Sequence, residues 1–262
     1  MASQEDECFI LVKAQPHRSS KYFETVCCAG IGRDGKWRRQ YPVPFRILND
    51  GQKFRRWEWI QYEYTTSPSD RRRESQKVVP ESIVVAGSVK KSERSRFLNP
   101  LVRESFEDAE NRGESLVLLR PEIIQLMHEQ KSIEELENER ARHAELARQA
   151  SFFDKTAKPL ALCPVQFSVK WRDPYGKTRK HECDDWETSR AYIKFQNEYG
   201  EQKAVEILKD KYENQYFKSG LALAFSTHSR RNVTYGTKNQ WLLVGLIRLD
   251  ENPQGDLLLG AS

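Results

Sequence analysis

The segment at residues 57–66, WEWIQYEYTT, alternates aromatic or apolar residues with polar ones. Successive side chains of a strand point to opposite faces, so this pattern predicts a β-strand with one buried face. An apolar run of strand length precedes it at residues 8–14, CFILVKA. Further strands are predicted in KVVPESIVVAGSV, ALCPVQFSVKW, LALAFSTHS and QWLLVGLIRL. Sheets are therefore expected in both halves of the chain.

Helix signals lie between these strands. A long helix or a helix pair is expected from Pro121 to about residue 150, because proline suits the first position of a helix. A second helix is expected over residues 184–199, with Asp184 or Asp185 as its N-cap, and a third over about 202–217. The sequence thus predicts an α+β fold.

We expect three parts in this fold. Residues 1–120 would form a mixed β-sheet or partly open barrel that binds nucleic acid, and residues 121–155 a helical connector. Residues 156–262 would form an α/β half. A chain of 262 residues is long enough to bury such a core.

Charge is distributed unevenly along the chain. Residues 1–96 carry 19 Lys and Arg against 12 Asp and Glu, whereas residues 97–262 carry 24 against 26. A basic surplus in the first part attracts polyanions such as DNA, although a solvated basic face gives the same composition.

The first residues of the sequence and the spacing of its cysteines indicate in which cellular compartment the protein is expected. Acidic residues 5–7 stand where a signal peptide needs positive charge, and no stretch of eighteen apolar residues follows. The five cysteines lack the spacing of a disulfide framework. We therefore expect a cytoplasmic protein with reduced cysteines and no membrane contact.

The first candidate site surrounds Glu24. A helix beginning near Ser19 or Ser20 and ending at Gly30 or Gly32 would place Lys21 and Glu24 one turn apart. A carboxylate among cations stays ionised, so Glu24 is a candidate catalytic acid and Lys21 a candidate phosphate ligand. An ordinary surface ion pair is the alternative.

Two other segments carry candidate acids. In SDRRRES, Arg72 would clamp a phosphate while Asp70 positions it or acts in catalysis, although a solvated loop fits equally. In HECDDWE, Asp185 and Glu187 are further candidate catalytic acids, and capping of a helix is the structural alternative. The spacing of His181 and Cys183, with Cys163 and His228 elsewhere, does not match a typical zinc site, so no metal or other cofactor is predicted.

The segment KWRRQYPVPFR combines aromatic and basic residues. Its two prolines hold it extended, and a basic groove interleaved with aromatics suits an unpaired or flipped nucleotide. We expect the aromatic members to stack on a base and the basic residues, with Lys13, to hold phosphates. The DNA-binding candidates of this set are Lys13, Trp37, Arg38, Arg39, Tyr41, Phe45 and Arg46.

Several motifs together resemble a prokaryotic protein family found with mobile elements and defence loci. They comprise Lys13, Pro16, Ser19, Lys21, ETVCCAGI, GKWRRQYPVPFR, QKFRRWEWI, SDRRRES, HECDDWE and NQWLLVGLIRL. Within this setting the chain resembles phage-defence DNA glycosylases that remove glucosylated hydroxymethylcytosine. The resemblance implies phage DNA as the partner and a hypermodified base as the target.

These observations favour a DNA glycosylase that flips a nucleotide and hydrolyses its N-glycosidic bond, leaving an abasic site. Such chemistry needs a carboxylate and no metal. A metal-dependent nuclease using Asp185, Glu187 and His181 is one alternative, and a non-catalytic DNA-binding module is another. The chain has no P-loop, G-x-G-x-x-G or G-x-S-x-G motif, which argues against the common nucleotide and hydrolase sites.

Overall fold

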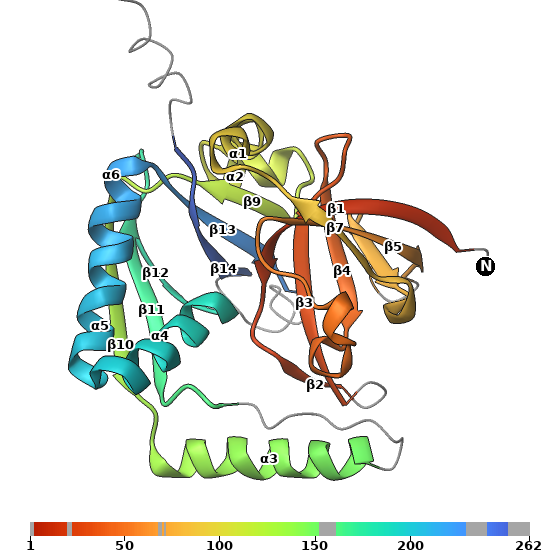
Figure 1. Ribbon diagram of the computed structural model, residues 1–262. Helices are drawn as coiled ribbons and strands as arrows, with labels where there is room; N and C mark the ends of the chain where they lie inside the picture. Colours follow the sequence, from red (N-terminus) through yellow and green to blue (C-terminus); the bar gives the residue numbers. More distant parts are fainter. Residues whose placement is uncertain are drawn as a thin grey trace, which may run out of the picture.

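The computed structural model describes residues 3–19, 23–67, 70, 72–151, 161–228 and 240–250. Strands and helices are mixed along the chain (Figure 1), which confirms the predicted α+β class. The strands of the first part are β1 (Gln4–Lys13), β2 (His17–Ser19), β3 (Phe23–Ile31), β4 (Trp37–Val43), β5 (Glu58–Thr66), β6 (Ser75–Val78) and β7 (Val84–Ser88). The later strands are β8 (Val102–Arg103), β9 (Leu116–Leu119), β10 (Ile123–Gln130), β11 (Val165–Arg172), β12 (Thr178–Glu182), β13 (Leu221–Thr227) and β14 (Trp241–Arg248).

The helices lie mainly in the second part of the chain. They are α1 (Lys91–Leu98), α2 (Phe106–Asn111), α3 (Ile133–Ser151), α4 (Trp186–Tyr199), α5 (Glu201–Lys209) and α6 (Phe217–Ser219). A π-helical segment, Asp210–Tyr216, joins α5 to α6. Single 3-10 turns are formed by Phe45–Ile47, Asp50–Gln52, Pro80–Ser82 and Asn99–Leu101.

Five strands of the first part close into a barrel in the order β1, β3, β4, β6, β5 and back to β1. The pairing of β4 with β6 is parallel, and the other pairs in the ring are antiparallel. The first half of β1 pairs with β5 and its second half with β3, so this strand closes the ring. The barrel is thus closed rather than partly open.

The second part of β1, from Cys8 onward, is buried on both faces, which explains its apolar sequence. Cys8 and Ile10 point into the barrel. Phe9 and Leu11 point outward and pack against β13 and β14 through Ala222, Ala224 and Val244, among other residues. A strand covered on two sides loses the polar alternation of a half-exposed strand.

A second sheet, in the order β14, β13, β9, β8, forms the centre of the molecule (Figure 1). Alternate residues of β13 face opposite layers: Ala222 and Ala224 contact the barrel, whereas Leu223 and Phe225 face the other side. The small alanines let the barrel approach this sheet closely. One sheet therefore shares its two faces between the two parts of the chain.

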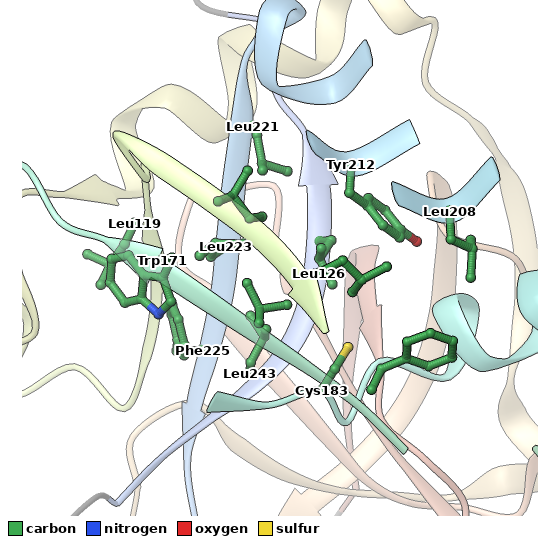
Figure 2. Close-up of a cluster of buried hydrophobic side chains, with 14 of the residues drawn as sticks. Leu119, Leu126, Trp171, Cys183, Leu208, Tyr212, Leu221, Leu223, Phe225 and Leu243 are labelled. Atoms are coloured by element: carbon green, nitrogen blue, oxygen red, sulfur yellow. The ribbon is translucent and has the colours of Figure 1, made fainter. Parts of the chain in front are cut away.

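The third sheet, in the order β10, β11, β12, packs on the far side of the central sheet under α4 and α5. Figure 2 shows the core between them, where Trp171 of β11 and Phe225 of β13 lie close to Leu223 and Leu243. Tyr212 and Leu208 enter the same core from the helical side.

The predicted helix between residues 19 and 32 is wrong, because this segment forms strand β3. Val26 and Cys28 point into the barrel, whereas Ala29 and Ile31 pack outside it, which is the two-residue period of a strand. Gly30 does not end a helix: a Cβ added there would lie 2.0 Å from the carbonyl oxygen of Phe9. The glycine is needed for the close approach of β1 and β3.

The long helix predicted from Pro121 is also partly wrong. Residues Ile123–Gln130 form β10, in which Ile124 and Leu126 are buried and Gln125 is exposed. This segment forms a strand because all of its residues pair with β11. The helix expected there begins only at Ile133.

Other predicted elements are confirmed. The alternating segment forms β5, the apolar segments near residues 8, 165, 221 and 241 form strands, and α4 begins directly after its N-cap Asp185. The third predicted helix corresponds to α5 and the π-helical segment. No helix within the described ranges has the length and apolar composition that crossing a membrane requires.

Candidate functional site

The segment that connects β12 to α4 ties the two parts of the chain together. Asp184 donates its backbone N–H to the Leu243 carbonyl at 2.8 Å and accepts from the Gln15 N–H at 3.0 Å. The side chain of Gln15 also donates to Ser189 on α4. The end of β1 and the first turn of α4 therefore hold each other in place.

Asp185 is completely buried beneath this connection. Its carboxylate caps α4 by accepting from the Glu187 N–H at 3.2 Å and from the Thr188 hydroxyl at 3.1 Å. It also lies 2.6 Å from a guanidinium nitrogen of Arg56, a residue in the segment that precedes β5 of the barrel. Because these groups enclose the carboxylate, Asp185 supports the fold and does not face a substrate.

Lys13, Phe45 and Glu187 come from three different candidate groups, and the structure brings them together. The ammonium of Lys13 lies 2.8 Å from the Glu187 carboxylate and 5.0 Å from the centre of the Phe45 ring. Burial raises the pKa of Glu187, but the charges of Lys13 and Arg56 outweigh burial and lower it overall. Glu187 is thus held ionised as a partner of Lys13, which also lies 5.8 Å from the ring of Trp186.

A pocket of about 290 Å³ opens beside this cluster. Its walls come from the end of β1 and start of β2, from α3, from the first turns of α4 and from the segment before β11. In Figure 1, α3 runs along the lower edge of the molecule below β2 and α4. We call this space the junction pocket, and its polar and aromatic lining includes Gln15, His17, Lys131, Glu139, Arg142, Asp184, Trp186 and Arg190.

Two ion pairs lie in the wall of the junction pocket. His17 Nε2 lies 3.7 Å from a carboxylate oxygen of Asp184, and this carboxylate raises the pKa of His17 despite the opposing effect of burial. The ammonium of Lys131 lies 2.8 Å from the Glu139 carboxylate. Arg142 and Arg190 also line the pocket, and neither has an acidic partner within the described residues.

Two family models match the chain, and the boundary between them lies near residue 100, shortly after the last strand of the first sheet. Residues 99–259 match the domain of unknown function DUF8757, and residues 4–104 match the domain of unknown function DUF8758. The chain belongs to the DUF8757 family. No curated protein matches the chain. The junction pocket draws residues from both matched regions, including His17 from the first and Asp184 from the second.

The surroundings of Glu24 differ from those expected. Glu24 lies on strand β3, is 7% exposed and pairs with Arg46 at 2.7 Å. The expected one-turn spacing to Lys21 does not exist in a strand, and Lys21 itself lies outside the described residues. A largely buried carboxylate with an arginine partner indicates a structural ion pair.

Arg39 and Arg72 join the barrel to the central sheet, and we call these two residues the arginine seam. Arg39 is 3% exposed, pairs with Glu74 at 3.0 Å and donates to Ser226 on β13. Arg72 donates to Asp70 through Nε at 2.8 Å and to the Thr227 carbonyl. Burial raises the pKa of Asp70, but hydrogen bonds from Arg72 and Ser75 outweigh it and lower the pKa to about 2.

Arg38 is also engaged within the protein. It lies 2.6 Å from the Asp6 carboxylate and 3.1 Å from the Asp34 carboxylate. Together with the seam, this pairing shows that the arginines expected to grip phosphates hold acidic side chains of the same chain. The guanidinium forks are occupied by carboxylates instead of phosphates.

The predicted base-stacking aromatics divide into two kinds. Trp37 is buried in the core between the barrel and the central sheet. Phe45 packs edge-on against Phe54 and Trp186, with ring centres 5.1 and 5.5 Å away. Tyr41 is 48% exposed and stays available for a base.

The metal ligands of the nuclease alternative do not form a site. His181 is buried, accepts a hydrogen bond from Trp171 at 3.0 Å and packs against Phe225, whereas Asp185 and Glu187 pair with Arg56 and Lys13. Among the residues with described positions, no group of three or more His, Cys, Asp or Glu side chains is arranged to hold a metal ion. The ligand set of the nuclease alternative therefore does not converge.

Sequence reasoning named Asp184 as a possible helix cap but did not recognise the junction pocket. Asp184 carried one usable signal, because it stands beside the helix cap yet is not needed for capping. His17, Arg142 and Arg190 come from segments far apart in sequence and carried no such signal. Their proximity depends on how α3 and α4 pack against the end of β1.

Proposed function

We propose that this chain is a DNA-directed enzyme that draws one nucleotide into the junction pocket and hydrolyses its N-glycosidic bond, leaving an abasic site. The observation that supports this most is the Asp184 carboxylate in the pocket wall, with His17 3.7 Å away. Asp184 takes the place of Glu24, Asp70, Asp185 and Glu187 as the candidate catalytic acid. Each of those four residues is paired with a cation at 2.8 Å or less.

The size of the pocket favours a single extruded nucleotide. Ligand sites in proteins start at roughly 300 Å³, and this pocket of about 290 Å³ lies at that lower limit. A duplex does not enter such a space, so its base must leave the stack first. Trp186 contributes to the wall, but it is only 9% exposed and its ring packs against Phe45.

The chemistry needs two groups. As the bond between C1′ and the base nitrogen breaks, its electron pair leaves with the base and positive charge develops on the sugar. The carboxylate of Asp184 stabilises this charge and accepts a proton from the water that attacks C1′. His17, whose pKa is raised by Asp184, carries the proton that the departing base requires.

The choice of DNA rests on the basic surplus of residues 1–96 and on the motifs quoted above. These motifs make phage DNA with glucosylated hydroxymethylcytosine the first substrate to test. In this proposal the enzyme acts in the cytoplasm, where infecting DNA is exposed to it.

The test incubates the purified chain with two DNAs, one containing glucosylated hydroxymethylcytosine and one containing plain cytosine, with and without EDTA. We expect mass spectrometry to detect a free modified base from the first DNA, with alkali-labile strands and no effect of EDTA. Direct strand breaks that EDTA abolishes would support the nuclease instead. Binding without any released base would reduce the chain to a DNA-binding module.

A further inference from the structure

The charged side chains of the junction pocket do not balance. Lys131 is paired with Glu139, and His17 is paired with Asp184. Arg142 and Arg190 remain, so the pocket carries two positive charges that no acid within the described residues compensates. A basic surplus inside a concave site attracts an anionic ligand more strongly than the same charges on a flat surface.

The two arginines approach the pocket from different helices. Arg142 lies on α3 and Arg190 on α4, and both side chains are exposed. Nε of Arg142 donates to the Asn138 carbonyl at 3.2 Å within its own helix, which leaves its terminal nitrogens for a ligand. Two guanidinium groups therefore line one pocket from separate helices.

We infer that Arg142 and Arg190 form a phosphate subsite and that the ligand of the junction pocket is a nucleoside 5′-phosphate group. The planar guanidinium matches the oxygens of a phosphate with paired hydrogen bonds. A terminal phosphate carries between about 1.5 and 2 negative charges at neutral pH, which balances the two arginines. The nucleoside part of this inference rests on the proposed function, whereas the phosphate part rests on the charge balance alone.

Such a phosphate has two sources. It can belong to a free mononucleotide, or to a nucleotide within a DNA strand, where the two flanking phosphodiesters carry one charge each. Both present the same chemistry to the two arginines, so the experiment uses one probe for each source.

Calorimetric titrations with inorganic phosphate, deoxycytidine, deoxycytidine 5′-monophosphate and a cytosine-containing single-stranded 9-mer test the inference. We expect the monophosphate or the 9-mer to bind at least about tenfold more tightly than the nucleoside, the effect of one charge-assisted hydrogen bond or more. Inorganic phosphate should compete with that ligand. Tight binding of the monophosphate indicates a free nucleotide, and tight binding of the 9-mer alone indicates a strand.

The variants Arg142→Gln and Arg190→Gln should each remove most of the tenfold advantage. Arg96→Gln is the matched control, because Arg96 is also an exposed helical arginine but lies on α1, at the opposite edge of the molecule from α3 (Figure 1). Equal binding of nucleoside and phosphorylated ligands, no binding of any probe, or unchanged binding in both pocket variants would overturn the inference.

These results separate the inference from the proposed function. Arginine-dependent phosphate binding without base release from any DNA keeps the subsite and removes the glycosylase. Base release that is unchanged in both arginine variants keeps the glycosylase and removes the subsite.

Discussion

The arginine seam and the junction pocket use the same residue type in opposite ways. In the seam, Arg39 and Arg72 face Glu74 and Asp70 and are turned toward the inside of the molecule. In the pocket, Arg142 and Arg190 are exposed and form no ion pair with an acid among the residues whose positions are described. Internal compensation of charge therefore distinguishes arginines that hold a fold together from arginines available to a ligand. The number of arginines in a stretch of sequence does not show which of these two roles they have.

The largest change in stability is expected when the arginine seam is disrupted. Arg39 is buried and Glu74 half-buried, so Arg39→Met leaves a largely desolvated carboxylate without its cation. This change should lower the free energy of unfolding by about 3 kcal/mol. Urea denaturation measures the change, and Arg96→Met is the exposed control, with an expected effect within about 0.5 kcal/mol.

A double variant tests whether the loss comes from the pair itself. Arg39→Met combined with Glu74→Leu removes both charges and should recover much of the stability lost by Arg39→Met alone. A single variant that costs less than about 1 kcal/mol would mean that the seam does not hold the two parts together.

The next largest effect is expected for a variant of the junction pocket. Asp184→Asn keeps the shape but removes the charge facing the sugar, so base release should fall about a hundredfold or more while the melting temperature changes little. Asp108→Asn, on the surface of α2, is the control and should keep full turnover. Full activity of Asp184→Asn would exclude this carboxylate from catalysis.

The third effect concerns the pH dependence of the seam. Asp70 has a folded pKa of about 2, below its ordinary value of 3.8, so its ionised form stabilises the fold. This contribution is fully present above the ordinary value and is lost as the pH falls toward about 2. Asp70→Asn should therefore cost about 1–2 kcal/mol at pH 6.

The same comparison at low pH checks the sign. The difference in unfolding free energy between the native chain and Asp70→Asn should shrink as the pH is lowered from 5 to 3 in urea titrations. A cost that is constant over this range would show that Asp70 acts through packing and not through its charge.

The smallest expected effect involves Tyr41. Its ring is exposed, so Tyr41→Ser should change the free energy of unfolding by no more than about 0.5 kcal/mol. Titration of the same variant with single-stranded DNA tests the stacking role predicted from sequence. A weaker complex with intact stability supports that role, whereas a large loss of stability would place the ring in the fold.

Local patterns were sufficient for much of the fold. The alternating aromatic segment forms a strand over Glu58–Thr66, as its two-residue period predicts, and α4 begins at Trp186 because Asp185 is an effective cap. Local sequence patterns gave wrong predictions at a glycine and a proline, because each of these residue types occurs in more than one structural setting. Gly30 serves a close strand contact and not the end of a helix, and Pro121 precedes a strand.

The sequence by itself determined the α+β class, most strands, the helix after Asp185 and the excess of positive charge in the first part of the chain. Only the tertiary structure decided which charges are compensated. Glu74 and Asp6 lie 35 and 32 residues from their partners Arg39 and Arg38, and His17 meets Asp184 from the other half of the chain. The physical reason is that compensation depends on distance in space, and a linear sequence records composition and local period but not which distant side chains come within a few ångströms of each other.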